Sequence, residues 1–218
     1  MEKYEQMTTT KNKIKRFGIM FVISSPSGAG KTTLARMLLK NNTDIELSIS
    51  CTTRKRREAE INNKDYIFVS DDVFDKMVDQ NQFLEHAMVF GNKYGTPKEA
   101  VTKKLIEGKD ILFDIDWQGT QALREKEPKH VVSVFILPPS KNALEERLIA
   151  RAQDPIKEVK KRMDKANSEI THWPEYDYLI INDDLEETAK KLQSILIAER
   201  LKRSRQTGLN DFVRQMLL

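Results

Sequence analysis

The stretch that decides the fold reads Gly18-Ile19-Met20-Phe21-Val22-Ile23-Ser24, followed by Ser25-Pro26-Ser27-Gly28-Ala29-Gly30-Lys31-Thr32. Its first part is a short continuous apolar run, which is typical of a strand buried on both faces of a parallel sheet. A glycine-rich turn follows, and residues 31–40 then place Leu34, Met37 and Leu38 at helical spacing. Strand, glycine turn and helix in this order predict the opening of an α/β domain of the kind that binds nucleotides.

The rest of the chain continues this alternation. Further buried strands are predicted over residues 111–115, 131–136 and 178–181. Helical patterns occupy residues 97–107, 118–126, 141–171 with a break at 152–155, and 185–200. Strands that alternate with helices predict a parallel sheet covered by helices on both sides, that is, a three-layer α/β/α core.

Two segments depart from the alternation. Between residues 51 and 96, apolar runs at 66–69 and 83–90 flank a short helix at 71–80, which predicts a small antiparallel lobe. The last stretch, 202–218, is interpreted as one more helix after Gly208.

Composition limits the classes of protein this can be. With 218 residues the chain is expected to form one globular unit. Its single cysteine, Cys51, excludes an intramolecular disulfide and a cysteine-based metal cluster, which favours a reducing compartment. The apolar run at 19–23 is far short of the roughly 20 residues of a membrane span, and residues 1–16 lack the apolar core of a secretory signal. We therefore expect a cytoplasmic protein without a membrane partner.

Residues 25–32 nearly match the phosphate-loop pattern G-x-x-x-x-G-K-[ST], with Ser25 at the first position. In such a loop, glycines let successive N–H groups point at phosphate oxygens beside a helix N-terminus. The lysine neutralises the β- and γ-phosphates, and the hydroxyl that follows reaches Mg²⁺. A coincidental glycine-rich turn is the alternative, but the flanking strand and helix favour a nucleoside triphosphate site. The expected ATP-binding residues are Ser25, Pro26, Ser27, Gly28, Ala29, Gly30, Lys31, Thr32 and Thr33.

A second phosphate site is predicted in the small lobe, where Arg54-Lys55-Arg56-Arg57 forms a basic run. A basic run is often only a solvated loop. Here it follows the phosphate-loop helix in sequence, and Arg54 and Arg57 could fork onto one phosphate with tyrosine hydroxyls completing its coordination.

At these residues the chain closely resembles the guanylate kinase family. The pattern S-x-T-T-R-x-P-R-x-G-E is legible at 50–60, with Arg56 and Ala59 in place of proline and glycine. Motifs F-[IL]-E, G-N-x-Y-G-[ST] and D-x-D-x-Q-G stand at 83–85, 91–96 and 114–119, and Y-D-Y and N-D-D-L at 176–178 and 182–185. The resemblance runs from about Phe17 to Arg200.

The resemblance implies a P-loop NTPase fold with an inserted, β-rich GMP-binding lobe and a helical lid. The implied core comprises residues 17–50, 97–140 and 173–218, the lobe 51–96 and the lid 141–172. Residues 1–16 are expected to form a flexible extension.

For the acceptor nucleotide, the resemblance implies that Arg54, Arg57, Tyr66 and Tyr94 hold the phosphate of GMP. It implies that Glu85 reads the base, and the chemistry agrees: a carboxylate accepts two hydrogen bonds, which suits the adjacent N1–H and N2–H₂ of guanine. Adenine offers neither donor there, so the carboxylate would be left unpaired. The remaining implied GMP contacts are Ser50, Thr96 and Asp114.

For the donor nucleotide, the resemblance places one of Asp114 and Asp116 at the acceptor and the other near Mg²⁺. We assign Asp116 and Thr32 to the metal, directly or through water, although the sequence leaves the two aspartates interchangeable. The implied catalytic residues are Lys31 and the lid arginines Arg147, Arg151 and Arg162, and Asn182 is implied at ATP. The neighbouring Lys157, Lys160, Lys161 and Lys165 are interpreted as solvated charges of a helix face.

The predicted activity is transfer of a phosphoryl group from ATP to GMP, with Mg²⁺. Basic sites for the phosphates of ATP and GMP, together with two basic terminal segments, then account for the pI of about 9.0. We expect no nucleic-acid polymer as partner. Two alternatives are a guanylate-kinase-like module that binds peptides and a kinase for another phosphorylated acceptor. An intact Lys31, Thr32 and Glu85 argue against the peptide-binding module, and an intact Glu85 with Ser50 and Thr96 argues against the other kinase. The sequence leaves the choice between monomer and homo-oligomer open.

Overall fold

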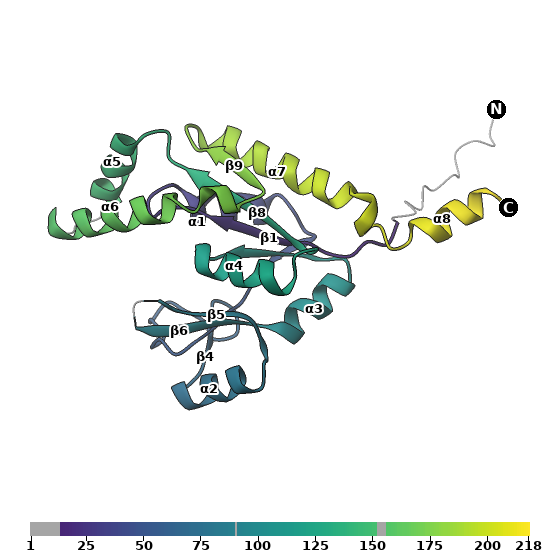
Figure 1. The fold of residues 1–218 in the computed structure, drawn as a ribbon, viewed down its shortest axis with the longest axis horizontal. Coiled ribbons are helices and arrows are strands. Elements are labelled where there is room, and N and C mark those ends of the chain that lie inside the picture. The colour runs from purple at the N-terminus through teal and green to yellow at the C-terminus, as the bar shows by residue number, and fades with distance from the viewer. Residues whose placement is uncertain (1–13, 90, 152–155) are drawn as a thin grey trace.

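The computed structural model describes residues 14–89, 91–151 and 156–218, and of residues 151 and 156–159 only the backbone. Its larger sheet is built around β1 (Met20–Ser24) and runs parallel throughout, in the order β2-β7-β1-β8-β9 (Figure 1). Phe21 of β1 lies between Leu112 and Val132 of its two neighbours. The other strands of this sheet are β2 (Ile45–Leu47), β7 (Asp110–Asp114), β8 (Val131–Leu137) and β9 (Tyr178–Ile181).

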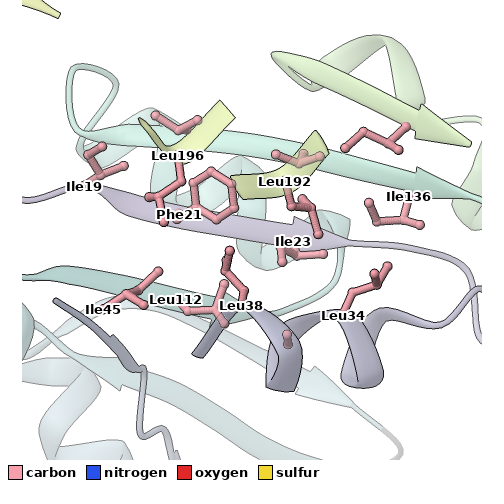
Figure 2. Close-up of a cluster of buried hydrophobic side chains, with 14 residues drawn as sticks. Ile19, Phe21, Ile23, Leu34, Leu38, Ile45, Leu112, Ile136, Leu192 and Leu196 are labelled. Carbon is pink, nitrogen blue, oxygen red and sulfur yellow. The ribbon is translucent and has the colours of Figure 1, made fainter. Parts of the chain in front are cut away.

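Helices cover both faces of this sheet: α1 (Lys31–Lys40) and α7 (Leu185–Leu201) on one side, α3 (Lys98–Ile106) and α4 (Trp117–Lys126) on the other. Side chains of a strand alternate between faces, so Phe21 and Ile23 join the cluster with α1 and α7 shown in Figure 2. Met20 and Val22 pack toward α3 and α4. Both halves of the apolar run are buried, and the predicted α/β fold is confirmed.

The sequence missed one strand of the larger sheet, β2. It has only three residues, and Glu46 at its centre is partly exposed because the strand forms the sheet edge. Lys104 and Lys109 each place an ammonium group 2.6 Å from the Glu46 carboxylate. A three-residue edge strand with a charged centre carries too little apolar pattern to be recognised.

The small lobe holds a four-stranded sheet in the order β4-β3-β6-β5, covered by α2 (Asp71–Asp79). Phe74 of α2 stacks on Phe83 of the sheet, with ring centroids 4.7 Å apart. The sheet is mixed rather than antiparallel as predicted, because β3 and β4 run parallel. The long loop between those two strands returns the chain to its starting direction. The strands are β3 (Cys51–Thr52), β4 (Ile67–Phe68), β5 (Phe83–Val89) and β6 (Asn92–Pro97).

The segment predicted as a lid forms two helices, α5 (Lys141–Arg151) and α6 (Ile156–Ile170), which pack through Leu144, Leu148, Met163 and Ala166. A short helical turn, η1 (Trp173–Glu175), leads into β9. After α7 come η2 (Arg203–Arg205) and α8 (Leu209–Met216), the predicted final helix. None of the helices in the described part of the chain is long and apolar enough to cross a membrane.

The segment that leads into β1 and the segment that follows α7 lie side by side, at what we call the base of the larger sheet. The Phe17 N–H donates to the Arg205 carbonyl and the Gly208 N–H to the Lys15 carbonyl, both at 2.9 Å. Beside them, the fully buried Asp110 accepts hydrogen bonds from the guanidinium groups of Arg16, at 2.6 and 2.9 Å, and of Arg200, at 2.6 Å. This carboxylate therefore links the segment before β1 and the last turn of α7 to β7.

Replacing Asp110 by alanine should destabilise the protein by about 3–5 kcal/mol, because two largely buried guanidinium groups lose their counter-charge. For a chain of this size the melting temperature falls by roughly 10 °C. The control is Glu46→Ala, which removes a carboxylate from a neighbouring strand at a partly exposed site and is expected to cost less than about 1 kcal/mol. Thermal unfolding followed by circular dichroism measures both, and equal losses would contradict the role given to Asp110.

Candidate active site

A cavity of about 460 Å³ opens between the small lobe and the larger sheet, at the carboxyl ends of β1 and β7. Ligand sites of open α/β sheets gather at this edge. Three groups of predicted residues line it: the phosphate loop, Ser50 with three side chains of the lobe, and the two aspartates at the end of β7. They are Ser25, Pro26, Ser27, Gly28, Gly30, Lys31 and Thr32; Ser50, Tyr66, Glu85 and Tyr94; and Asp114 and Asp116.

The phosphate loop is shaped by two glycines in the left-handed region, Gly28 at φ 92° and Gly30 at φ 98°. A side chain at Gly28 would also press on Leu144 and Leu148 of α5, each 3.1 Å from a built Cβ. Gly30 is the N-cap of α1 and supplies no side-chain capping bond. The first N–H groups of α1 are therefore left without a side-chain acceptor at the end of the helix that borders the cavity. An anion is favoured at such a helix N-terminus.

Lys31 is the principal cation of the cavity. Its ammonium group lies 2.5 Å from Asp114 Oδ1 and 3.4 Å from the Ile115 carbonyl. Both charged side chains are only partly exposed. The loop lysine and an acidic residue from the end of β7 thus neutralise each other across the cavity.

Glu85 is a buried carboxylate, 4% exposed, on β5 opposite Thr96 of β6. The Thr96 hydroxyl donates to Glu85 Oε1 at 2.6 Å. Burial raises the pKa of Glu85; the Thr96 hydrogen bond acts in the opposite direction, and the nearby charge of Asp116 adds to the rise. Gly119 leaves room beside the carboxylate, since a built Cβ there would lie 3.4 Å from Glu85 Oε2.

Arg54 and Arg57 do not line the cavity. The Arg54 guanidinium is forked onto Glu60, with Nη2–Oε1 at 2.7 Å and Nη1–Oε2 at 3.1 Å, which raises its pKa still further. It also lies over the Tyr66 ring, 5.3 Å from the centroid. The Arg57 N–H donates to the same carboxylate at 2.8 Å, while its side chain is exposed. Glu60 therefore organises the basic loop.

Two oxygen groups suited to Mg²⁺ face the cavity, the Thr32 hydroxyl and the Asp116 carboxylate. Asp116 is also the N-cap of α4, where its Oδ1 accepts the Gly119 N–H at 3.1 Å. Within the described ranges, no three His, Cys, Asp or Glu side chains converge to hold a metal by themselves. Hard oxygen donors in small number fit Mg²⁺, which commonly completes its shell with water and substrate phosphates.

The lid segment contributes more to the cavity than the sequence suggested. Lys165 and Glu169 of α6 line it. The Lys165 side chain is 45% exposed, as predicted for a solvated charge, and its ammonium group lies 3.6 Å from Glu169; the sequence did not show that this charge faces the cavity. Its spacing of three residues from Arg162 places both on one helix face, which is the signal that could have found it. Arg162 is half-buried. Arg151 ends α5, and its side chain lies outside the described part.

Asn182 follows β9 and is 1% exposed. Its side chain is not among the cavity residues; its amide donates to the Ala29 carbonyl of the phosphate loop at 2.7 Å. Arg147 Nη2 donates to the Asn182 main-chain carbonyl at 3.2 Å. Ala29 is fully buried and Thr33 is exposed on α1, and neither lines the cavity.

Comparisons with known proteins identify the family of the chain. A sequence model of the guanylate kinase family matches residues 18–199. The chain is 53% identical over 210 residues to a guanylate kinase of Paramagnetospirillum magneticum, covering 96% of this chain and 98% of the relative. It is 55% identical to one of Nitrobacter winogradskyi, with 93% of each chain covered.

A solved structure shows the same likeness in three dimensions. The guanylate kinase from Anaplasma phagocytophilum superposes with a TM-score of 0.75 at 39% identity, covering 93% of this chain and 96% of that one. The family match and the close relatives together confirm the resemblance found in the sequence motifs. The chain belongs to the guanylate kinase family.

Proposed function

We propose that the protein transfers the γ-phosphoryl group of ATP to the phosphate of GMP, giving ADP and GDP. An oxygen of the GMP phosphate forms the new bond to the γ-phosphorus as the bond to the β–γ bridging oxygen breaks. The observation that carries the proposal is the shared cavity, in which the phosphate loop faces the buried Glu85 carboxylate. Donor and acceptor can be bound there side by side.

Glu85 selects the acceptor base. An ionised carboxylate only accepts hydrogen bonds, and guanine presents the adjacent donors N1–H and N2–H₂. The Thr96 hydroxyl holds one carboxylate oxygen at 2.6 Å, which fixes the plane of the group before the base arrives. Because adenine lacks those donors, its binding would leave a desolvated charge without a partner.

The acceptor phosphate is held at the mouth of the lobe. Arg54 and Arg57 supply charge, and Tyr66 and Tyr94 line the cavity with ring centroids 6.0 Å apart. In the structure the Arg54 guanidinium is forked onto Glu60. We infer that the phosphate dianion competes with this carboxylate, since both fit the same planar fork of donors.

The donor phosphates occupy the loop between β1 and α1. Lys31 exchanges its contact with Asp114 for the β- and γ-phosphates, which leaves Asp114 to the acceptor. Thr32 and Asp116 would hold Mg²⁺, which when bound offsets charge on the phosphate oxygens. The loop N–H groups and Lys31 then keep the γ-phosphorus in line with the acceptor oxygen, and alignment of this kind supplies much of the rate.

The lid supplies further positive charge. Arg147, Arg151 and Arg162 are proposed to neutralise the triphosphate during transfer, and Lys165 joins them from the cavity wall. A covered site also excludes water, which would otherwise accept the phosphoryl group. The peptide-binding module and the kinase for another acceptor are not favoured, since the close relatives are guanylate kinases along nearly their whole length.

An ADP-release assay with four acceptors tests the proposal. GMP should support turnover at least about 10²-fold above AMP, because AMP leaves the buried carboxylate unpaired. UMP and ribose bisphosphate should give no more than the background hydrolysis of ATP. Preferential use of ribose bisphosphate would favour the kinase for another acceptor, and failure with every acceptor by folded protein would contradict the enzyme.

The proposed reaction is assigned to the cytoplasm, as the sequence predicts. Burial raises the pKa of the Cys51 thiol to about 11, so this single cysteine stays protonated and unreactive at neutral pH. The proposed partners are the two nucleotides and Mg²⁺.

A further inference from the structure

Asn182 reaches the phosphate loop from outside the cavity. Its amide nitrogen lies 2.7 Å from the Ala29 carbonyl oxygen, and a Cβ built on Gly30 would lie 2.6 Å from the same nitrogen. The side chain thus contacts the peptide between Ala29 and Gly30, and it does not itself line the cavity. Among the described residues, Asn182 supplies the side-chain hydrogen bond to that carbonyl.

The contact fixes the direction of a phosphate donor. In a planar trans peptide, the C=O of one residue and the N–H of the next point in opposite directions. With the Ala29 carbonyl held toward the buried Asn182, the Gly30 N–H is directed the other way, and Gly30 lines the cavity. Asn182 therefore sets the orientation of an N–H group that faces the anion.

The plane of the Ala29–Gly30 peptide is able to flip. It is flanked by Gly30 at φ 98°, and Gly28 at φ 92° lies just before it. Glycine populates positive and negative φ with similar ease. Without a donor behind the loop, the Ala29 carbonyl would be buried and unpaired, and rotation toward the cavity would relieve that penalty by exposing it to water. A carbonyl oxygen facing the cavity would repel phosphate.

Asn182 is itself fixed by the core and touched by the lid. Its main-chain N–H donates to the Leu137 carbonyl of β8 at 2.8 Å, and its main-chain carbonyl accepts from Arg147 at 3.2 Å. One residue therefore joins the sheet, the phosphate loop and α5.

The buried Asn182 amide is not explained by its packing alone. Its Oδ1 atom is buried and has no hydrogen-bond partner in the described part of the chain. Burying a polar atom without a partner is unfavourable, so an apolar side chain of the same volume would serve the packing at least as well. The amide donor is what such a side chain would lack.

We propose that Asn182 is a positioning residue, which holds the Ala29–Gly30 peptide with its N–H toward the donor phosphates. This role differs from the direct contact with ATP that the resemblance implies for Asn182. The inference rests on the proposed function only in taking the loop's anion to be a nucleotide phosphate. Recognition of GMP is not involved.

Two variants test the proposal, Asn182→Leu, which keeps the volume, and Asn182→Asp, which keeps the shape but removes the donor. Calorimetric titration with ADP, without acceptor, should show affinity reduced at least about tenfold in both. In the kinase assay the KM for ATP should rise while the KM for GMP stays within about twofold. Asn142→Asp makes the same chemical change at an exposed position of α5 and should change neither constant.

Each outcome decides the matter. ADP affinity equal to that of the parent protein in Asn182→Leu would overturn the proposal. A fall of more than about 10 °C in its melting temperature, or equal losses for ATP and GMP, would assign Asn182 a structural role instead. Because ADP binding is measured without acceptor, failure of the GMP assignment would leave the ADP result intact and therefore be distinguishable.

Discussion

Replacing Lys31 by alanine should lower the turnover number about 10³-fold, the loss seen when a charge-stabilising donor is removed from a transition state. The structure predicts a double effect. The variant removes the ammonium group that meets the triphosphate, and it frees the Asp114 carboxylate, which now lies 2.5 Å from that group. An unneutralised carboxylate then faces the incoming phosphates and adds repulsion to the lost attraction.

The affinity for GMP should stay close to that of the parent protein, because Glu85 and the basic loop are untouched. Steady-state kinetics with each substrate varied, together with calorimetric GMP binding, separates the two effects. Lys40→Ala is the matched control, since it removes the same charge from the exposed far end of the same helix. Unchanged turnover in Lys31→Ala would remove the phosphate-loop assignment.

Replacing Glu85 by glutamine should reduce kcat/KM for GMP by roughly 10²-fold, through the loss of two charge-assisted hydrogen bonds to the base. The amide presents a donor where guanine presents donors, and in a buried site no water relieves the mismatch. ADP binding at the loop should remain unchanged. Glu99→Gln repeats the substitution at an exposed position of α3 and should leave both nucleotides unaffected.

The same residue predicts a pH dependence. Burial raises the pKa of Glu85, so this carboxyl is protonated earlier than an ordinary one as the pH falls, and the protonated form cannot accept both hydrogen bonds. GMP affinity of the parent protein should therefore decrease on acidification through the raised pKa. The GMP phosphate titrates as well, but it does so equally with Glu85→Gln, so the ratio of the two affinities isolates Glu85. A ratio independent of pH, or comparable losses for GMP and ADP, would contradict the base-reading role.

The core of the fold could be predicted because β1 is buried on both faces. Ile19 through Ile23 form an unbroken apolar run, and a glycine turn between such a strand and a helix is typical of a phosphate-binding loop. β2 could not be predicted, because Glu46 at its centre interrupts the apolar pattern. This charge is tolerated at the sheet edge because lysines from α3 and the following turn pair with it, and those contacts exist only in the folded chain. The parallel pairing of β3 with β4 depends on the path of a loop, which no local pattern encodes.

The candidate site shows the same division. Glu85 and Lys31 stand in local motifs whose chemistry is specific, so both could be predicted. The fork of Arg54 on Glu60 lies within one motif, yet the sequence does not tell whether the arginine faces a phosphate or a carboxylate. Lys165 joins the cavity only when α6 packs beside it, and Asn182 contacts Ala29 across a separation of 153 residues.

The paired backbone bonds at the base of the larger sheet, from Phe17 to Arg205 and from Gly208 to Lys15, give the described chain the topology of a closed ring. The lobe and the lid are two insertions in this ring. The lobe lies between β2 and β7 and the lid between β8 and β9, and each pair of strands is adjacent in the sheet. We expect a displacement of the lobe or of the lid to leave the two backbone bonds that close the ring in place. Fluorescent labels near Lys15 and Gly208 would consequently keep a constant separation while labels on α2 and α5 report the motion, which makes the base of the ring the natural internal reference for such a measurement.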